Sequence, residues 1–153
     1  MRTNTITLRE LTLRYAPKRG TEGKALIIGA NLSDVRVAAA PFEAIMRDEP
    51  CEVFGMLCLS TKNRVIAYHE VSRGTLDATL DHLREVFKAE LLANAAGMIL
   101  GPNHPSGDPT PSPDDSSLTA GRAVAERLLG VPVLDHLVIG DGRTFSFRFA
   151  GRL

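Results

Sequence analysis

The sequence predicts an α/β protein in which a mixed β-sheet is packed by helices on its faces. Short apolar runs bounded by Gly, Pro or Asn, which are typical of strands, alternate with longer segments whose apolar residues recur at helical spacing. The chain has 153 residues, 44% hydrophobic and 24% charged, which is an ordinary globular composition. That length suffices to bury a sizeable core, so we expect one domain covering residues 1–153.

Each element is assigned from the period of its apolar residues. The predicted strands, from two-residue alternation or short apolar runs, are residues 3–15, 25–29, 51–60, 64–71, 95–100, 131–139 and 144–149. The predicted helices, from apolar residues three and four apart, are residues 35–47, 76–92 and 117–129. Ser33-Asp34 is a good N-cap pair for the first helix, and Gly130 stops the last. Residues 61–63 form a turn, so the strands on either side are expected to pair as a hairpin.

Charge and cysteine content narrow the function classes. The formal net charge is zero, which removes bulk electrostatics as an argument for binding nucleic acid or a membrane. The two cysteines, Cys51 and Cys58, form neither a disulfide framework nor a CxxC site, and both fit an apolar strand. No signal peptide, transit peptide or membrane-spanning apolar run is visible, so we expect a cytoplasmic protein.

A proline-rich loop at residues 101–115 is the most informative segment. Its five prolines stiffen it, because each fixes φ and restricts the residue before it. Loops of this length are usually functional or disordered, and the prolines argue against disorder. The loop carries one imidazole, His104, and three carboxylates without any Lys or Arg. A rigid, acidic, His-containing loop at the end of a strand is typical of a metal cradle.

The end of the same loop also has the pattern of a helix start. Ser112 suits an N-cap, Pro113 the first helical position, and Asp115 the third, where a carboxylate completes a capping box. Without any further motif, this pattern favours capping over catalysis. Both roles stay open for Asp115, because its carboxylate has two oxygens. We expect an ordered loop in which Ser112 caps the following helix.

These residues resemble a known signature. His104-Pro105 followed by Ser112-x-x-Asp115 is similar to the motif of JAMM (JAB1/MPN-type) zinc metallopeptidases. The wider text NHPSGDPTPSPDD resembles the RadC branch of that superfamily, a group long labelled as DNA-repair proteins. The resemblance runs from about Glu43 to the C-terminus, while residues 1–32 are a less family-like strand region. It implies the JAB/MPN fold, which is similar in architecture to cytidine deaminases.

Two positions depart from the RadC pattern. Pro102 stands where the family has the first His of His-x-His-Pro, and Leu83 follows His82 where the family usually has proline. The side chain of proline cannot coordinate a metal, so one family zinc ligand is missing. Two remaining ligands make a much weaker site, and zinc is expected to be weakly held or absent.

The resemblance also implies roles for four residues. Glu52, in a Glu-x-x-Gly-x-Leu pattern, resembles the general base, and Ser112 resembles the donor to the developing oxyanion. His104 and Asp115 resemble zinc ligands. Without the motif, Glu52 would be a solvated strand-edge carboxylate and His104 a loop histidine. We expect all four side chains to converge on one cleft.

Other side chains carry donor atoms that could replace the missing ligand. His69, on a predicted strand, has the pattern of a half-buried strand histidine and is the first alternative ligand. His82 and His136 are expected to be structural. Asp108 and Asp114 are expected to be turn and cap residues, although both offer oxygen donors.

Two hypotheses of function follow. The first is a RadC-like JAMM metallopeptidase or isopeptidase, acting on a peptide or isopeptide substrate, whose hydrolase chemistry is impaired or lost through Pro102. The second is a metal-free pseudoenzyme, a JAB-fold module that binds protein or nucleic acid. A link to DNA repair comes only from the family label, since neither charge nor motif supports it. Metal content after purification without added zinc discriminates between the two.

Overall fold

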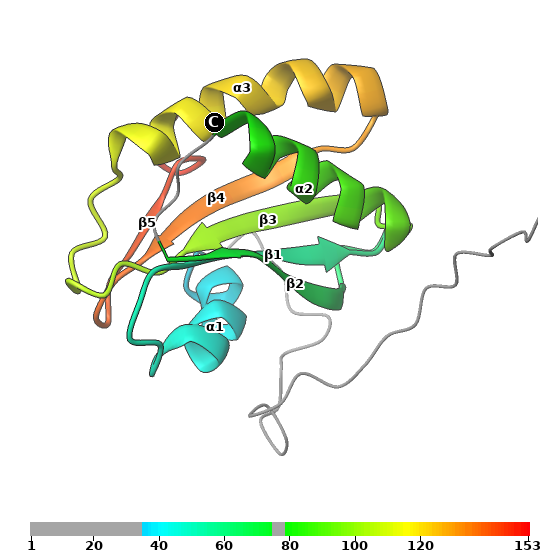
Figure 1. Ribbon diagram of the computed structural model, residues 1–153. Helices are drawn as coiled ribbons and strands as arrows, with labels where there is room; N and C mark the ends of the chain where they lie inside the picture. The colour runs from blue at the N-terminus through cyan, green and yellow to red at the C-terminus, as the bar shows by residue number, and fades with distance from the viewer. Residues whose placement is uncertain (1–34, 75–78) are drawn as a thin grey trace, which may run out of the picture.

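The computed structural model describes residues 35–74 and 79–153 (Figure 1). Within these ranges the elements in chain order are α1 (Val35–Met46), β1 (Val53–Leu59), β2 (Val65–Arg73), α2 (Thr79–Leu92), β3 (Gly97–Pro102), α3 (Pro113–Leu129), β4 (Val133–Ile139) and β5 (Thr144–Ser146). They build a five-stranded sheet flanked by helices, which confirms the predicted α/β class. The strands predicted at residues 3–15 and 25–29 lie outside the described residues.

The sheet is mixed, with the strand order β2-β1-β3-β4-β5. β1 pairs antiparallel with β2, as the hairpin prediction required, and antiparallel with β3 on its other side. β3 and β4 run parallel, so the chain must cross over between them, and α3 forms that crossover. β5 returns antiparallel to β4. The proline-rich loop therefore lies between the end of β3 and the start of the crossover helix.

Helices cover both faces of the sheet, with α1 on one face and α2 and α3 on the other (Figure 1). Alternate residues of β1 face the two layers: Phe54 and Met56 pack towards α2 and α3, whereas Val53 and Leu57 pack towards α1. Every residue of β1 and β3 is buried. This is why the central strands have near-continuous apolar sequences instead of a clean alternation.

Apart from the start of α2, which adjoins residues outside the described ranges, two element boundaries differ from the sequence prediction by more than two residues. α3 begins at Pro113, four residues before the predicted start at residue 117, because the Ser112 cap, and not the first apolar residue, sets its first turn. β5 ends at Ser146, three residues before the predicted end, because the chain then turns and the Ala150 amide donates back to the Ser146 carbonyl (3.0 Å). Within the described residues, no helix is both long and apolar enough to cross a membrane.

One fully buried carboxylate in the core, that of Glu90 of α2, has no hydrogen-bond partner for either of its oxygens within the described residues. Burial raises the pKa of Glu90 from 4.5 to about 6. Burial, assisted by the charge of Glu90, also raises the pKa of the Cys58 thiol to about 11. α2 therefore holds an ionisable group that opposes its own packing at neutral pH.

We expect Glu90→Gln to change how stability depends on pH. Between pH 4.5 and 6 the folded state binds more protons than the unfolded state, so the stability contributed by Glu90 falls as pH rises and is lost above pH 6. The loss is about 2 kcal/mol, from a pKa difference of about 1.5 units. Relative to the wild type, the variant should therefore gain about 2 kcal/mol in unfolding free energy between pH 4 and pH 8.

Urea unfolding at a series of pH values measures this change. Glu43→Gln, at a half-buried carboxylate of α1, is the matched control and should leave the pH profile of unfolding free energy nearly parallel to the wild type. Parallel profiles for Glu90→Gln as well would show that the buried carboxylate is not destabilising.

Candidate active site

The register between β1 and β3 brings the start of one strand to the end of the other. Phe54 pairs with Pro102, and the Asn103 amide donates to the Val53 carbonyl (3.2 Å), which continues the register by one residue. Glu52 therefore lies opposite His104. Both side chains lie on the face covered by α2 and α3, because residues two apart in a strand share a face.

The side chain of Asn103 links the end of β3 to the start of β1 by hydrogen bonds. Its side-chain oxygen accepts a hydrogen bond from the Val53 amide (2.6 Å), and its side-chain nitrogen donates to the Cys51 carbonyl (3.3 Å). Asn103 is buried, and its amide therefore satisfies backbone groups on both sides of Glu52. Nothing in the sequence pattern marked this residue, since its partners are fifty positions away along the chain.

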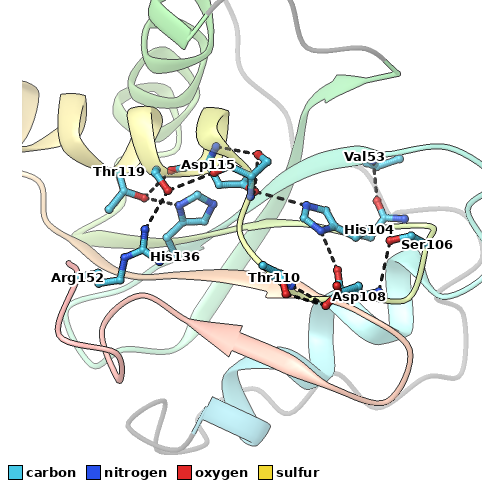
Figure 2. Close-up of polar contacts among 12 residues, drawn as sticks. Val53, His104, Ser106, Asp108, Thr110, Asp115, Thr119, His136 and Arg152 are labelled. Carbon is cyan, nitrogen blue, oxygen red and sulfur yellow. Dashed lines mark hydrogen bonds and ion pairs between the residues drawn. The ribbon is translucent and has the colours of Figure 1, made fainter.

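His104 is held between two oxygen atoms (Figure 2). Its Nδ1 lies 2.9 Å from the Asp108 carbonyl, which can only accept, so Nδ1 carries a proton and donates it. Its Nε2 faces the Asp115 Oδ2 atom at 3.4 Å. That distance exceeds the ~2.7–2.9 Å typical of a charge-assisted hydrogen bond.

Ser112 and Asp115 form the predicted capping box at the start of α3. The Asp115 amide donates to Ser112 Oγ (3.1 Å), and the Ser112 amide donates to Asp115 Oδ2 (2.7 Å). Ser112 Oγ also lies 2.8 Å from Oδ2 and donates its hydroxyl proton to it. Capping by Ser112 is thus confirmed. In this arrangement the hydroxyl proton is committed to Asp115, so donation to a reacting oxygen would require the hydroxyl to rotate.

The charges of Glu52, His104 and Asp115 influence one another. Burial raises the pKa of Glu52, the charge of His104 opposes that rise, and the negative charges of Asp115 and Asp114 add to it. The ion pair with Asp115 raises the pKa of His104 above its usual value, although burial acts in the opposite direction. For Asp115, burial raises the pKa, but the ion pair with His104 and the hydrogen bonds from Ser112 outweigh it, and the net shift is downward. The structure thus brings these side chains into one electrostatic cluster.

A second histidine supports Asp115 from beneath α3. Thr119 Oγ1 donates to the Asp115 carbonyl (2.8 Å) and lies 2.7 Å from His136 Nδ1 (Figure 2). Since the single hydroxyl proton of Thr119 is used, Nδ1 of His136 is the donor in that pair. His136 is fully buried and stacks on Phe147, with ring centroids 4.8 Å apart. Burial lowers the pKa of His136 to about 4, so this ring is neutral at pH 7.

The donor set does not complete a zinc site. Pro102 is buried on the same face as His104 and offers no donor atom. Within the described residues, no group of three or more His, Cys, Asp or Glu side chains is arranged to hold a metal ion. His69, the first substitute considered, pairs with Met56 and has Lys88 and Glu85 of α2 as charged neighbours instead of His104. The side chains present therefore do not fit the three-ligand geometry of a catalytic zinc.

We expect Asp115→Asn to lower the pKa of His104, because the carboxylate of Asp115 is the largest cause of its elevation. A titration of the His104 ring followed by NMR measures the shift. Asp114→Asn removes the adjacent, exposed carboxylate, which makes no hydrogen bond to His104, and should change the pKa of His104 less. Equal titration curves for wild type and Asp115→Asn would contradict the interaction.

The sequence of this chain is similar to those of known proteins. The family model of the RadC-like JAB domain matches residues 32–152. A UPF0758 protein of Methanosarcina barkeri is 45% identical over 106 residues, which is 69% of this chain and 46% of that protein. A UPF0758 protein of Symbiobacterium thermophilum is 50% identical over 102 residues, 67% of this chain and 44% of that protein. A third UPF0758 protein, of Nitrosococcus oceani, is 42% identical over 125 residues, which is 82% of this chain and 56% of that protein.

The chain spans about half the length of the curated relatives that it matches. The matched region covers α1 to β5 and includes Glu52, His104, Ser112 and Asp115. The recognition made from the proline-rich loop is thereby confirmed, and the chain belongs to the RadC-like JAB domain family.

Proposed function

We propose that this chain is a RadC-type, JAMM metallopeptidase-like domain whose hydrolase chemistry is impaired at the metal site. Family membership supports the first part of the proposal. The cluster of Glu52, His104 and Asp115 supports it further, since a general base and two metal donors are the groups that such chemistry requires. A peptide or isopeptide is the substrate class that this chemistry would act on.

The presence of proline at position 102 supports the second part of the proposal, that the metal site is impaired. It is buried at the end of β3, two residues before His104 and on the same face. An imidazole at that position would join Nε2 of His104 and Oδ2 of Asp115 as a third donor. With proline there, two donors remain, and no hydrolytic step is assigned to these side chains.

We expect Pro102→His to raise zinc affinity by at least roughly a hundred-fold. A third ligand should contribute ~3 kcal/mol or more of the ~10–16 kcal/mol with which complete structural sites bind zinc in peptides. Isothermal titration calorimetry of zinc on wild type and variant provides the comparison, with stoichiometry read from the same isotherm.

Two control variants separate the ligand effect from the loss of proline. Pro102→Ala relaxes the backbone without adding a donor and should bind zinc as weakly as wild type. Combining Pro102→His with Asp115→Asn removes a donor again and should reverse most of the gain. Tight binding of one zinc ion per chain by the wild type would overturn the impaired-site proposal.

A second candidate function is a metal-free binding module. A pocket of about 710 Å³ supports it, between the C-terminal end of α1, the proline-rich loop and the β4–β5 turn. Arg47 and Arg143 line this pocket with Glu43 and Asp141, and none of the four forms an ion pair within the part of the chain that the structure describes. A protein partner suits this mixed-charge lining better than nucleic acid, since the formal net charge of the chain is zero. Metal analysis of protein purified without added zinc distinguishes this function from a working zinc site, because a binding module retains none.

A further inference from the structure

The tip of the β4–β5 hairpin lies directly against the loop that carries His104. The His104 amide donates to the Ile139 carbonyl at the end of β4 (2.8 Å). The Asp141 amide of the hairpin tip donates to the Gly107 carbonyl (3.0 Å), and the Gly107 amide donates back to the His104 carbonyl (2.9 Å). The first two bonds join the hairpin and the loop at the backbone, where side-chain rotation cannot relieve a misfit, and the third closes a turn within the loop.

Gly140 is the residue at the centre of this contact. A Cβ atom added there would meet Pro109 Cδ at 2.9 Å and Pro109 N at 3.0 Å, and it would come closer still to the Gly107 carbonyl oxygen. The backbone of Gly140 is not among those with positive φ, so alanine would suffer no conformational strain at this position. The glycine is therefore required by proximity alone, because only a residue without a side chain lets the hairpin approach the loop this closely.

The contact adjoins the carbonyl group that orients His104. The imidazole is oriented through its Nδ1 bond to the Asp108 carbonyl, and the residues on either side of Asp108, Gly107 and Pro109, are the ones that a Cβ atom at position 140 would meet. If those backbone atoms move by several tenths of an ångström, the ring moves with them. Metal and catalytic constellations tolerate only about 0.5 Å of such displacement.

We propose that Gly140 is a positioning residue that sets the place of the His104 imidazole opposite Asp115. The proposal deepens the proposed function and rests on it, in that His104 is a donor of the impaired metal site. It assigns to the β4–β5 turn a role that its exposed, glycine-rich sequence does not suggest. The turn packs against the loop, and the absence of a Cβ atom at position 140 sets the distance between the backbones of the turn and the loop.

Gly140→Ala tests the proposal, with Gly142→Ala as a matched control in the same turn. Gly142 has a φ of +65°, and a Cβ atom added there would meet no atom within 4 Å, so its alanine variant strains the hairpin backbone without touching the loop. The first readout is amide hydrogen exchange at His104, together with the ring resonances of His104, in each single variant. The second is zinc affinity after each change is added to Pro102→His.

We expect Gly140→Ala to speed exchange of the His104 amide at least ten-fold and to shift the His104 ring resonances. Gly142→Ala should leave both near their wild-type values. With Pro102→His, Gly140→Ala should weaken zinc binding at least ten-fold and Gly142→Ala less than two-fold. Unchanged exchange and ring resonances at His104 in Gly140→Ala would overturn the proposal, as would equal effects of the two variants on the loop.

The two readouts distinguish this proposal from the proposed function. If Pro102→His fails to bind zinc, the impaired-site proposal fails, while the exchange of the His104 amide still decides the role of Gly140. If Gly140→Ala does not fold, Pro109→Ala takes its place, since it exchanges Cδ, the Pro109 ring atom nearest to position 140, for a smaller amide hydrogen. Faster exchange at the His104 amide is then expected, and an unchanged rate would overturn the proposal.

Discussion

The antiparallel register between β1 and β3 is the constraint on which the candidate site depends. It aligns Glu52 with His104, and a shift of one residue would turn every side chain of the shifted strand to the opposite face. The register is specified by burial on both faces, because Phe54 and Leu57 must enter different cores. The hydrophobic pattern of two central strands thus determines where polar side chains meet at their end.

Asp115 serves two purposes that compete for the same oxygen. Its Oδ2 accepts from the Ser112 amide and hydroxyl, and it also faces His104. A capping interaction of this kind is worth about 1 kcal/mol to a helix. The loop is held by the capping box, by Asn103 and by contacts with the β4–β5 turn, all of which are bonds within the protein. None of these bonds involves the side chain of Pro102.

Several residues that complete this neighbourhood carry no sequence signal. Asn103, Thr119 and His136 act through partners that are distant in sequence or hidden in a helix, and each looks like an ordinary loop, helix or strand residue when read locally. The sequence predicts only a structural role for His136. In the folded chain its neutral ring beneath α3 connects the stacked Phe147 to Thr119, and through Thr119 to the first turn of that helix.

The sequence by itself determined the α/β class, the order of the elements and the residues of the capping box, because these follow from local periods and short-range hydrogen bonds. It also identified the family, since the motif lies within one loop and one helix start. Only the tertiary structure decided that Glu52 faces His104, that His69 lies elsewhere under α2, and that Gly140 abuts the loop. Those facts depend on strand register and on backbone contact between segments about thirty to fifty residues apart, which no local pattern encodes.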